Sequence, residues 1–501
     1  HPHPTQGVPN MAEPMQIDFN KFEGTVPYKN IDFLGRCYDV IRINPLDLSQ
    51  RIRDGGGATT ESIVQITPES CTQLTPDKSL YIPEGTRYLS ESRGERTSRT
   101  QTWFSSFDFS HSFEHTVSAG LDIPGLVSFS ASLTYRQLEK TSSSNETIET
   151  FVQSFFEDCS IELNHDFIKK LPLSSRFTSE VAKLTSESAC AAFIKTFGTH
   201  YAREVTFGGR MYQRVHISSK EYSRFVERGV DISSSASATY QGATANTGTS
   251  TSTSSSSAFK QSSGLTIDSI QWVGGTPSTD FNEWVKSIRQ DPKPLQLDLK
   301  PLYELFTAEY FPQDSDIQKK KTWMMQAVDT HIRTEGFTRP DVSSMANKEF
   351  YFRSRWRADP GEKRVNKHLS FSGENVQLYA DDNTNDLVPW KLIPVPGKSD
   401  EYYIRSRWRA DLGDKRLDYH LSFDGNTLKL FHRDNVADLV PWKFIPVPGK
   451  TDEFYIRNRW RAEKGDDRAD KTLSFEGDSG KLYPKDDYYN LVPWKLEPAK
   501  S

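Results

Sequence analysis

The sequence predicts an α+β chain in two parts: a body that contains a bent strand, followed by an all-β unit of three repeats. Two observations predict this organisation. The C-terminal third repeats with a period of 52 residues, and a pair of glycines interrupts a strand pattern far upstream. With 501 residues, the chain can form two or three domains that each bury a core. We expect an N-terminal extension or tag at 1–27, a body at 28–340 and the repeats at 346–501.

Charge and composition exclude several classes of protein. The formal net charge is only −5, so the chain lacks the basic balance typical of nucleic-acid-binding proteins. The composition, with 35% apolar and 26% charged residues, is that of a chain that folds in water. No run approaches the roughly 18 apolar residues of a membrane-spanning helix, and the residues before Met11 do not resemble a signal peptide. Any entry into a membrane would therefore use strands.

Each repeat contains about four short strands. It opens with an aromatic strand such as FYFRSRWRAD, continues through HLSF or TLSF and a strand such as VQLY, and ends with LVPWK. Four short strands cannot bury a core alone, so the repeats at 349–400, 401–452 and 453–501 must close on one another. Three copies are also fewer than the blades of a propeller.

This threefold pattern resembles a β-trefoil. The YIR-type strand that opens a repeat and the Pro-Trp-Lys that ends it are similar to ricin-type trefoil lectins, although Val-Pro-Trp stands where those lectins carry Gln-x-Trp. We interpret the Trp residues of this motif as part of the core. They are Trp390, Trp442 and Trp494.

An arginine-rich strand and turn recurs in each repeat and supplies candidate binding residues. One interpretation is a solvated face with internal ion pairs. The other is three equivalent pockets for a glycan or an anionic lipid head group, in which guanidinium groups donate hydrogen bonds and Trp rings stack. Three such sites would bind with avidity. The candidate residues are Trp356, Arg357, Asp359, Trp408, Arg409, Asp411, Trp460, Arg461 and Glu463.

A compact signature precedes the repeats. It consists of Phe197-Gly198-Thr199-His200-Tyr201 and, six residues later, Gly208-Gly209. This resembles the signature of the membrane-attack-complex/perforin (MACPF) family, although the family usually has Tyr or Trp at the position of Phe197. Trp272-Val273-Gly274-Gly275 downstream also fits the order of motifs in that family.

The resemblance implies a bent central antiparallel sheet flanked by helical clusters. It also implies a ring of subunits in which each chain inserts two β-hairpins into a membrane. A bend agrees with the residues themselves, because the Gly pair in VTFGGRMYQRV allows sharp turns and close backbone approach; an ordinary bulge in a rigid sheet is the alternative. No nucleophile or carboxylate accompanies His200 in the motif, so we interpret it as a structural hydrogen-bonding residue.

A first candidate membrane hairpin lies upstream of the signature. A barrel strand needs about 9 to 11 residues whose alternate side chains face lipid, and the run from Val127 to Arg136 alternates in this way. A half-buried strand of a soluble sheet would give the same period. The candidate lipid-facing residues are Phe107, Phe109, Phe113, Val127, Phe129, Ala131, Leu133 and Tyr135.

A second candidate hairpin lies between the Gly pair and residues 272–275. Its middle, from Thr244 to Ser263, is so rich in Ser and Thr that composition alone indicates a flexible polar linker. In the MACPF family this place holds the second inserting segment, which is stored in water as helices. The candidate lipid-facing residues are Ile232, Ala236, Ala238, Tyr240, Leu265 and Ile267.

The sequence offers no sign of catalysis. It contains no P-loop, GxSxG, HExxH or dinucleotide-binding motif, so we expect no enzyme, no cofactor and no catalytic residue. Its four cysteines form no CxxC pair and lie near no spaced His set, which argues against a metal site. The sequence leaves two alternatives for these cysteines: two disulfides or four buried thiols. The cysteines are Cys37, Cys71, Cys159 and Cys190.

These observations predict a pore-forming cytolysin or defence protein, secreted as a soluble monomer and then bound to a target-cell membrane. Its expected partners are a lipid bilayer, further copies of itself in a ring, and a glycan or anionic lipid head group held by the repeats, with no nucleic acid. A non-lytic, carbohydrate-binding protein with a MACPF fold and an immune or developmental role is the alternative, and a pure lectin is a third. The alternating run at 127–135 distinguishes a pore former from a pure lectin.

Overall fold

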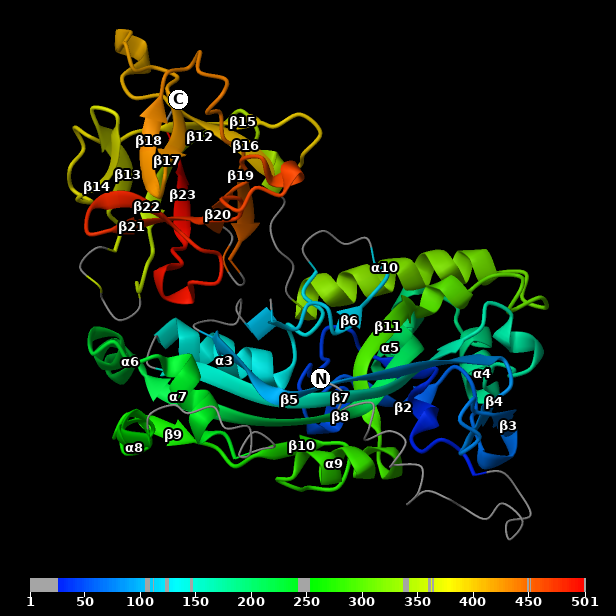
Figure 1. Cartoon of the computed structure of the whole chain (residues 1–501). Helices are drawn as coiled ribbons and strands as arrows, with labels where there is room; N and C mark the ends of the chain where they lie inside the picture. Colours follow the sequence, from blue (N-terminus) through cyan, green and yellow to red (C-terminus); the bar gives the residue numbers. More distant parts are fainter. Residues whose placement is uncertain are drawn as a thin grey trace. The chain divides into compact units, whose positions relative to one another are not determined.

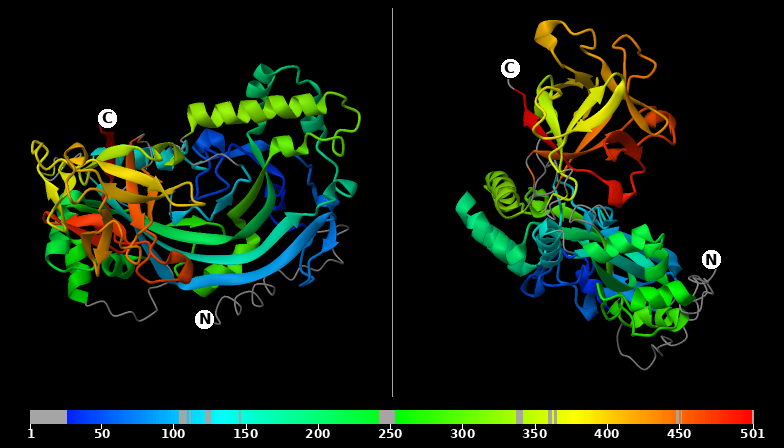
Figure 2. Two further views of the ribbon diagram at one scale, coloured as in Figure 1. Left: turned by 90° about the horizontal axis from the view of Figure 1, so that it is seen from above. Right: turned by 90° about the vertical axis from the view of Figure 1, so that its left-hand side faces the viewer.

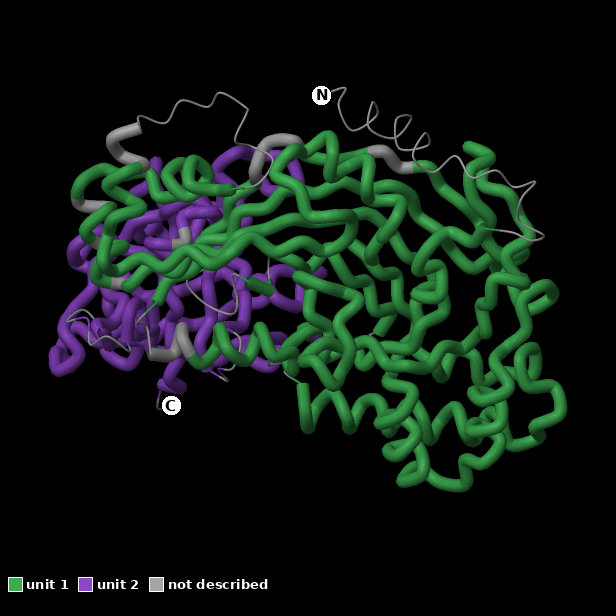
Figure 3. The backbone as a smooth tube through the Cα atoms, turned by 90° about the horizontal axis from the view of Figure 1, so that it is seen from below, with its two compact units in different colours: residues 1–123, 127–142, 146–337 green, residues 124–126, 143–145, 338–501 purple. Residues whose placement is uncertain are grey.

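The computed structural model of the chain divides into two compact units (Figure 3). One unit, here called the body, holds residues 1–123, 127–142 and 146–337; the other, the repeat unit, holds 338–501 together with 124–126 and 143–145. The predicted N-terminal extension lies outside the described residues, except for its last two positions. The structure describes residues 26–103, 109–110, 112–121, 126–144, 147–241, 253–336, 342–358, 362, 365–447, 450 and 452–499.

Long antiparallel strands form the centre of the body. Strand β7 (Thr147–Leu163) pairs with β5 (Thr86–Trp103) on one side and with β8 (His200–Ser218) on the other. The first half of β8 pairs with β11 (Lys293–Pro301), whereas its second half pairs with β10 (Gln271–Val273) and with β9 (Leu265–Ile267). Figure 2 shows the long strands curving together.

Shorter elements complete the body. The nine-stranded sheet also contains β1, β2 and β6, and a separate two-stranded sheet contains β3 and β4. Helix α5 packs against α10 and β2, whereas α7 packs against β5 and β7. Figure 1 shows α6, α7 and α8 together at one end of the long strands. These elements are β1 (Arg36–Tyr38), β2 (Ala58–Ser62), β3 (Cys71–Leu74), β4 (Tyr81–Pro83), β6 (Val117–Ser118), α3 (Leu133–Ser144), α4 (Ser175–Ala182), α5 (Glu187–Phe197), α6 (Ser219–Glu227), α7 (Ile232–Thr239), α8 (Thr253–Lys260), α9 (Phe281–Ser287) and α10 (Ile317–Glu335).

Local sequence explains where the helix before the signature begins and ends. The Ser186 side chain accepts a hydrogen bond from the backbone N–H of Ala189 and caps the start of α5, and Glu187 places a negative charge in the first turn. The helix ends at Gly198, whose φ of 74° is a backbone conformation that favours glycine. The end of α5 therefore leads directly into the start of β8.

In the described part of the repeat unit there are twelve strands, four from each repeat. The first and fourth strands pair in the closed ring β12, β15, β16, β19, β20, β23 and back to β12. The second and third strands form three hairpins, whose third strands β14, β18 and β22 pair with one another. The repeats thus form a closed β-barrel with three hairpins. Their strands are β12 (Glu349–Ser354), β13 (His368–Ser372), β14 (Asn375–Tyr379), β15 (Trp390–Pro394), β16 (Glu401–Ser406), β17 (His420–Asp424), β18 (Thr427–Phe431), β19 (Trp442–Pro446), β20 (Glu453–Asn458), β21 (Thr472–Glu476), β22 (Ser479–Tyr483) and β23 (Trp494–Pro498).

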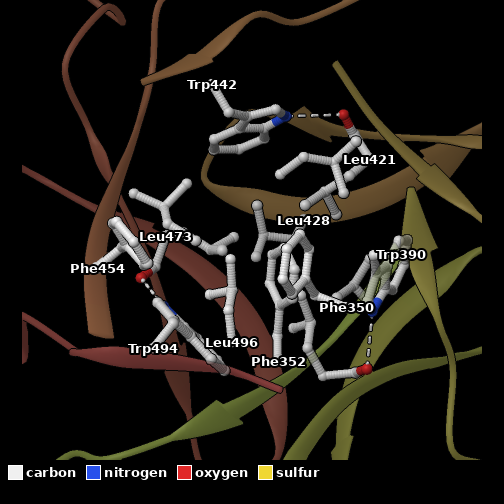
Figure 4. Packing of buried hydrophobic residues seen from close by; sticks show 14 of the residues in the cluster. Phe350, Phe352, Trp390, Leu421, Leu428, Trp442, Phe454, Leu473, Trp494 and Leu496 are labelled. Carbon is white, nitrogen blue, oxygen red and sulfur yellow. Dashed lines mark hydrogen bonds between the residues drawn. The ribbon is translucent and has the colours of Figure 1, made fainter. Parts of the chain in front are cut away.

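The core of the repeat unit follows its threefold pattern (Figure 4). The Trp residue of each Val-Pro-Trp motif is fully buried and donates its indole N–H to a leucine carbonyl of the same repeat. The pairs are Trp390 with Leu369 at 3.0 Å, Trp442 with Leu421 at 3.1 Å, and Trp494 with Leu473 at 3.0 Å. The prediction that these Trp residues belong to the core is confirmed.

The four cysteines are free and buried, so of the two open alternatives the structure contains buried thiols. Burial disfavours the thiolate and raises the pKa of both Cys71 and Cys190 to about 11. None of the described helices is both long enough and apolar enough to span a bilayer.

Candidate functional site

The glycine pair of the signature lies where β8 exchanges one neighbouring strand for another. Gly208 is paired with Lys293 of β11, and Arg210 is paired with Val273 of β10. A Cβ atom on Gly208 would lie 2.0 Å from the carbonyl oxygen of Phe156 in β7. Only glycine therefore fits at this point of the bent sheet.

The second glycine pair packs against the first. Gly274 and Gly275 have φ values of 89° and 73°, and a Cβ on Gly274 would lie 2.7 Å from the Gly208 carbonyl oxygen. Trp284 of α9 donates its indole N–H to the Gly274 carbonyl at 3.1 Å, and a Cβ on Gly209 would lie 2.8 Å from its ring. Gly209, Gly274 and Gly275 therefore pack around Trp284, and Gly208 packs against Gly274.

A bulge in β7 faces this bend. The register between β7 and β8 shifts between Glu157 and Cys159, so that Asp158 has no partner in β8. Arg289, in the short helix η6 (Ile288–Gln290) that follows α9, donates from Nε to both carboxylate oxygens of Asp158, at 3.0 and 3.2 Å. The Tyr28 hydroxyl donates to the same carboxylate at 2.7 Å.

The Arg289 guanidinium also joins the long strands to the β3–β4 hairpin. It pairs with Asp77, and it donates to the Ser79 hydroxyl at 2.8 Å and to the Tyr88 hydroxyl at 2.7 Å. Burial alone would raise the pKa of Asp77, but hydrogen bonds from Ser79 and Thr75 and the charge of Arg289 hold this pKa at about 2. One buried cation therefore links η6, β5, β7 and the β3–β4 hairpin at the bend.

Sequence reasoning missed this ion cluster. Asp158 and Arg289 lie 131 positions apart, and neither belongs to a recognisable local pattern. A bulge that places a carboxylate in the core could not be recognised from an alternating strand pattern alone.

The start of the signature forms a junction between β1 and β8. The Thr199 hydroxyl accepts a hydrogen bond from the backbone N–H of Val40 at 3.0 Å and lies 2.7 Å from Nδ1 of His200. The ring of His200 is fully buried, and this burial lowers its pKa to about 3. A Cβ on Gly198 would lie 2.4 Å from the carbonyl oxygen of Tyr38. His200 and Thr199 thus occupy a structural junction.

Two aromatic residues frame this junction. The ring of Phe197 stacks on Phe193 within α5, with the centroids 4.5 Å apart. Tyr201, the residue after His200, is buried at the start of β8 and is paired with Cys37 of β1.

The first candidate hairpin differs from the expected strands. Residues 128–131 form a turn, and α3 begins at Leu133. Ala131 is half-buried and Leu133 is 52% exposed, whereas Phe107 lies outside the described residues. The alternation therefore does not form a strand here, because its large side chains are buried in an aromatic cluster and not on the face of a sheet.

This aromatic cluster holds the first candidate segment against the sheet. Trp103 of β5 stacks on Phe151 of β7 at 5.0 Å, and Phe109 meets Trp103 edge-on at 5.0 Å. Phe129 lies 5.6 Å from Phe109, and Tyr135 lies 6.3 Å from Phe129. Phe113 and Val127 belong to the same cluster. Five of the eight candidate lipid-facing side chains are thus buried together.

The second candidate segment is mainly helical. Ile232 and Ala236 are buried on α7, Ala238 is exposed, and Tyr240 follows the end of the helix. The Tyr240 hydroxyl donates to the Met211 carbonyl at 3.1 Å. Helices are what the family resemblance implied for this segment in water.

Its polar middle is described only in part. Residues 242–252 lie outside the described residues, and α8 occupies Thr253–Lys260. The chain returns along β9, where Leu265 and Ile267 are half-buried and paired with Ile217 and Val215 of β8.

The family model of the MAC/Perforin domain matches residues 14–339, which is more than half of the chain. The chain belongs to the MAC/Perforin family. This finding confirms the resemblance that the signature indicated. The repeat unit lies almost entirely outside the matched residues.

Three solved structures are similar to this MAC/Perforin chain. GNIP1Aa from Chromobacterium piscinae is 14% identical with a TM-score of 0.45, covering 85% of this chain and 89% of that one. A protein with a MAC/Perforin domain from Bacteroides thetaiotaomicron is 13% identical with a TM-score of 0.34, covering 73% and 69%. Astrotactin-2, a vertebrate-specific, perforin-like membrane protein involved in neuronal development, is 16% identical with a TM-score of 0.29, covering 58% and 97%. These TM-scores are low, so the assignment to the MAC/Perforin family rests on the match of the domain model alone.

Outside the MAC/Perforin match, the repeat unit carries a recurrent stack of arginine on tryptophan, here called the Trp–Arg stack. Arg357, Arg409 and Arg461 have φ values of 51°, 52° and 51°, a left-handed conformation that non-glycine residues seldom adopt. Their guanidinium carbons lie 5.2, 4.5 and 4.5 Å from the ring centroids of Trp356, Trp408 and Trp460.

In the second and third repeats, another arginine lies over the same tryptophan ring. Arg416 lies 4.6 Å from the Trp408 centroid, and Arg468 lies 4.3 Å from the Trp460 centroid. The Trp408 indole N–H is also occupied, because it donates to the Asn385 carbonyl at 3.3 Å. Guanidinium groups therefore take the positions over these rings where a sugar was expected to stack.

The arginines of a stack differ in their ion pairs. Arg416 pairs with Asp414 at 3.2 Å and Arg468 pairs with Asp466 at 2.9 Å; the hydrogen bond from Arg468 lowers the pKa of Asp466 to about 2. Such pairs fit the expected face with internal ion pairs. By contrast, within the described part of the chain neither Arg409 nor Arg461 forms an ion pair.

Among the described residues, the acids predicted to accompany these arginines form no ion pair with them. Glu463 lies 3.6 Å from Lys398, and Asp411 is exposed. Asp359 falls outside the described residues.

Proposed function

We propose that this MAC/Perforin chain is a pore-forming cytolysin or defence protein. It is secreted as a monomer, binds a target membrane through the repeat unit, assembles into a ring and inserts two β-hairpins per subunit. The observation that carries this proposal is the aromatic cluster around Trp103, because it buries five side chains of a segment whose sequence alternates like a lipid-facing strand. Exposure of such a face in water would favour aggregation.

The position of the two stored segments supports the proposal. The first segment lies between β5 and β7, whose ends are already paired at Trp103 and Glu149. The second lies between β8 and β9, which are paired at Ile217 and Leu265. Each segment could thus extend an existing antiparallel pair without any new connection, and each can supply two strands of about 9 to 11 residues.

A barrel assembled from such hairpins needs several subunits. One subunit would contribute two hairpins, which leave unpaired edges until neighbouring subunits pair with them. Insertion after ring assembly would protect these edges from water and from non-specific pairing.

We further propose that the repeat unit is a β-trefoil of the ricin type. The closed ring of six strands, the three hairpins and the threefold core around Trp390, Trp442 and Trp494 support this assignment. Its expected ligand is a glycan or an anionic lipid head group, and we expect neither an enzymatic activity nor a cofactor.

A labelling experiment tests insertion of the first segment. Single cysteines replace Ala131 or Leu133, on the candidate lipid face, and Ser128 or Arg136, on the other face; each carries a polarity-sensitive fluorophore. We expect dye release from target-cell membranes, with the probes at 131 and 133 moving to an apolar environment and those at 128 and 136 remaining in water.

Two outcomes would contradict the proposal. Dye release without this alternation would show that another segment inserts. Membrane binding without dye release or ring-shaped oligomers would instead favour the non-lytic, carbohydrate-binding alternative.

A further inference from the structure

The Trp–Arg stacks of the second and third repeats each present one arginine whose guanidinium group has no hydrogen bond or ion pair among the described residues. Arg409 and Arg461 are exposed, and their guanidinium planes lie over Trp408 and Trp460. Stacking engages the face of a guanidinium group and leaves its N–H donors available for a planar or tetrahedral anion. Both arginines share the same left-handed backbone conformation, so the geometry recurs in full.

The stacks are poorly suited to a neutral sugar. A sugar ring usually packs its apolar face on an aromatic ring, but two guanidinium groups lie within 4.6 Å of the Trp408 centroid and two within 4.5 Å of the Trp460 centroid. Two cations over one ring favour an anionic ligand instead. Asp414 and Asp466 form ion pairs with the second arginine of each stack, and among the described residues no ion pair reaches Arg409 or Arg461, although the charges of both acids also act on these two arginines.

Exposed apolar side chains accompany the same loops. Leu412, in the turn η9 (Ala410–Leu412) directly after Arg409, is 73% exposed. Val436 is 78% exposed and directly precedes Ala437. In the 52-residue repeat, Ala437 occupies the position of Asn385, whose carbonyl accepts the hydrogen bond from Trp408. A cation next to an exposed aliphatic side chain is the pattern of a surface that enters a lipid interface.

We propose that the Trp–Arg stacks of the second and third repeats bind the phosphate of anionic lipid head groups, while Leu412 and Val436 enter the interfacial layer. This inference rests on the proposed function, since it names the ligand through which the repeat unit reaches a membrane. Arg409 and Arg461 donate to the phosphate. Two stacks on one rigid barrel engage one bilayer together.

The test uses the full chain and flotation with phosphatidylcholine vesicles, with and without phosphatidylserine. Arg409→Gln combined with Arg461→Gln should weaken binding to the phosphatidylserine vesicles by about 30-fold, because each basic residue near such a surface contributes about 1 kcal/mol. The matched control is Lys443→Gln combined with Lys495→Gln. These two cations occupy equivalent positions of the same repeats within strands β19 and β23, outside the turns that carry the stacks, Leu412 and Val436, and the variant loses the same charge. The control should bind nearly as well as the unmodified chain.

A second variant separates a lipid surface from a soluble anion. Leu412→Ser combined with Val436→Ser should weaken vesicle binding and leave binding of inorganic phosphate unchanged. Strong competition by inorganic phosphate, with no effect of these serines, would overturn the membrane part of the proposal. Thermal unfolding of each variant checks that the fold is intact.

The outcomes also separate this inference from the pore proposal. Binding to phosphatidylserine vesicles that depends on Arg409 and Arg461, without dye release, would support the lipid site and contradict the pore. Dye release that the arginine variant leaves unchanged, or equal binding by the arginine variant and its control, would overturn the lipid site alone.

Discussion

Arg289 and Asp158 form an ion pair at the bend of the sheet, and the exposed fractions of their side chains are 3% and 0%. The pair connects a bulge in β7 to the short helix that follows α9. Both charges would lose hydration without a partner, so neither can be removed alone without leaving a buried charge. A straightened sheet would have to move the bulge relative to η6. We therefore interpret the pair as the contact that holds the bent conformation.

Arg289→Gln should lower the free energy of unfolding by about 3 to 5 kcal/mol, because Asp158 would remain buried and lose its cation. Urea unfolding measures the change. Arg333→Gln is the control, since Arg333 pairs with Asp329 at 3.0 Å in an exposed position and such pairs contribute about 1 kcal/mol or less. If the bend opens during pore formation, Arg289→Gln should also release dye faster than the control. An equal loss of stability in the two variants would contradict the assigned role.

The sequence predicted the repeated part of the molecule and the positions that only one residue type can occupy. Trp390, Trp442 and Trp494 were recognised because an internal repeat shows its core by spacing alone. Gly208 and Gly209 were recognised because a strand pattern seldom contains two glycines; the close approach of the Phe156 carbonyl accounts for the first, and the ring of Trp284 accounts for the second.

The structure differs from the sequence prediction where one pattern of apolar residues is compatible with two kinds of structural environment. Val127 and Phe129 alternate like a strand, but alternation records only which side chains are apolar, and an aromatic cluster buries them equally well. The stacking of Arg416 and Arg468 on tryptophan depends on turns whose backbone conformation no local pattern specifies. The Arg289 cluster joins segments that tertiary folding alone brings together.

Gly208→Ala should destabilise the body more than any exposed glycine substitution. The added Cβ would lie 2.0 Å from a backbone oxygen, which can move only if β7 moves with it. We expect a loss of more than about 2 kcal/mol in the free energy of unfolding. Gly477→Ala is the control, because Gly477 has a φ of 61° and no atom within 4 Å of its Cβ position; it should cost only about 1 kcal/mol. A smaller loss for Gly208→Ala than for Gly477→Ala would show that the sheet adapts at the bend.

A disulfide between β5 and α7 should lock the second stored segment. The hydroxyl oxygens of Thr100 and Ser237 lie 2.5 Å apart, so a cystine can replace them with little movement. Thr100→Cys combined with Ser237→Cys should bind membranes normally after oxidation but release no dye, because α7 could not leave the sheet. Reduction should restore the release, and either single cysteine should behave like the unmodified chain. Release by the fully oxidised double variant would show that α7 stays in place during pore formation.

His200 should make the body less stable in mild acid. Burial lowers its folded-state pKa to about 3, from 6.5 for an ordinary histidine, so the unfolded chain binds a proton that the folded chain does not. The stabilising contribution is complete above pH 6.5 and decreases as the pH falls towards 3, by about 1.4 kcal/mol for each pH unit. His200→Asn retains a side chain that can bond to Thr199 and cannot titrate. The decrease in urea midpoint between pH about 7 and 5 should therefore be smaller for His200→Asn than for the unmodified chain. Equal pH dependence in the two proteins would mean that His200 takes up a proton within the folded body.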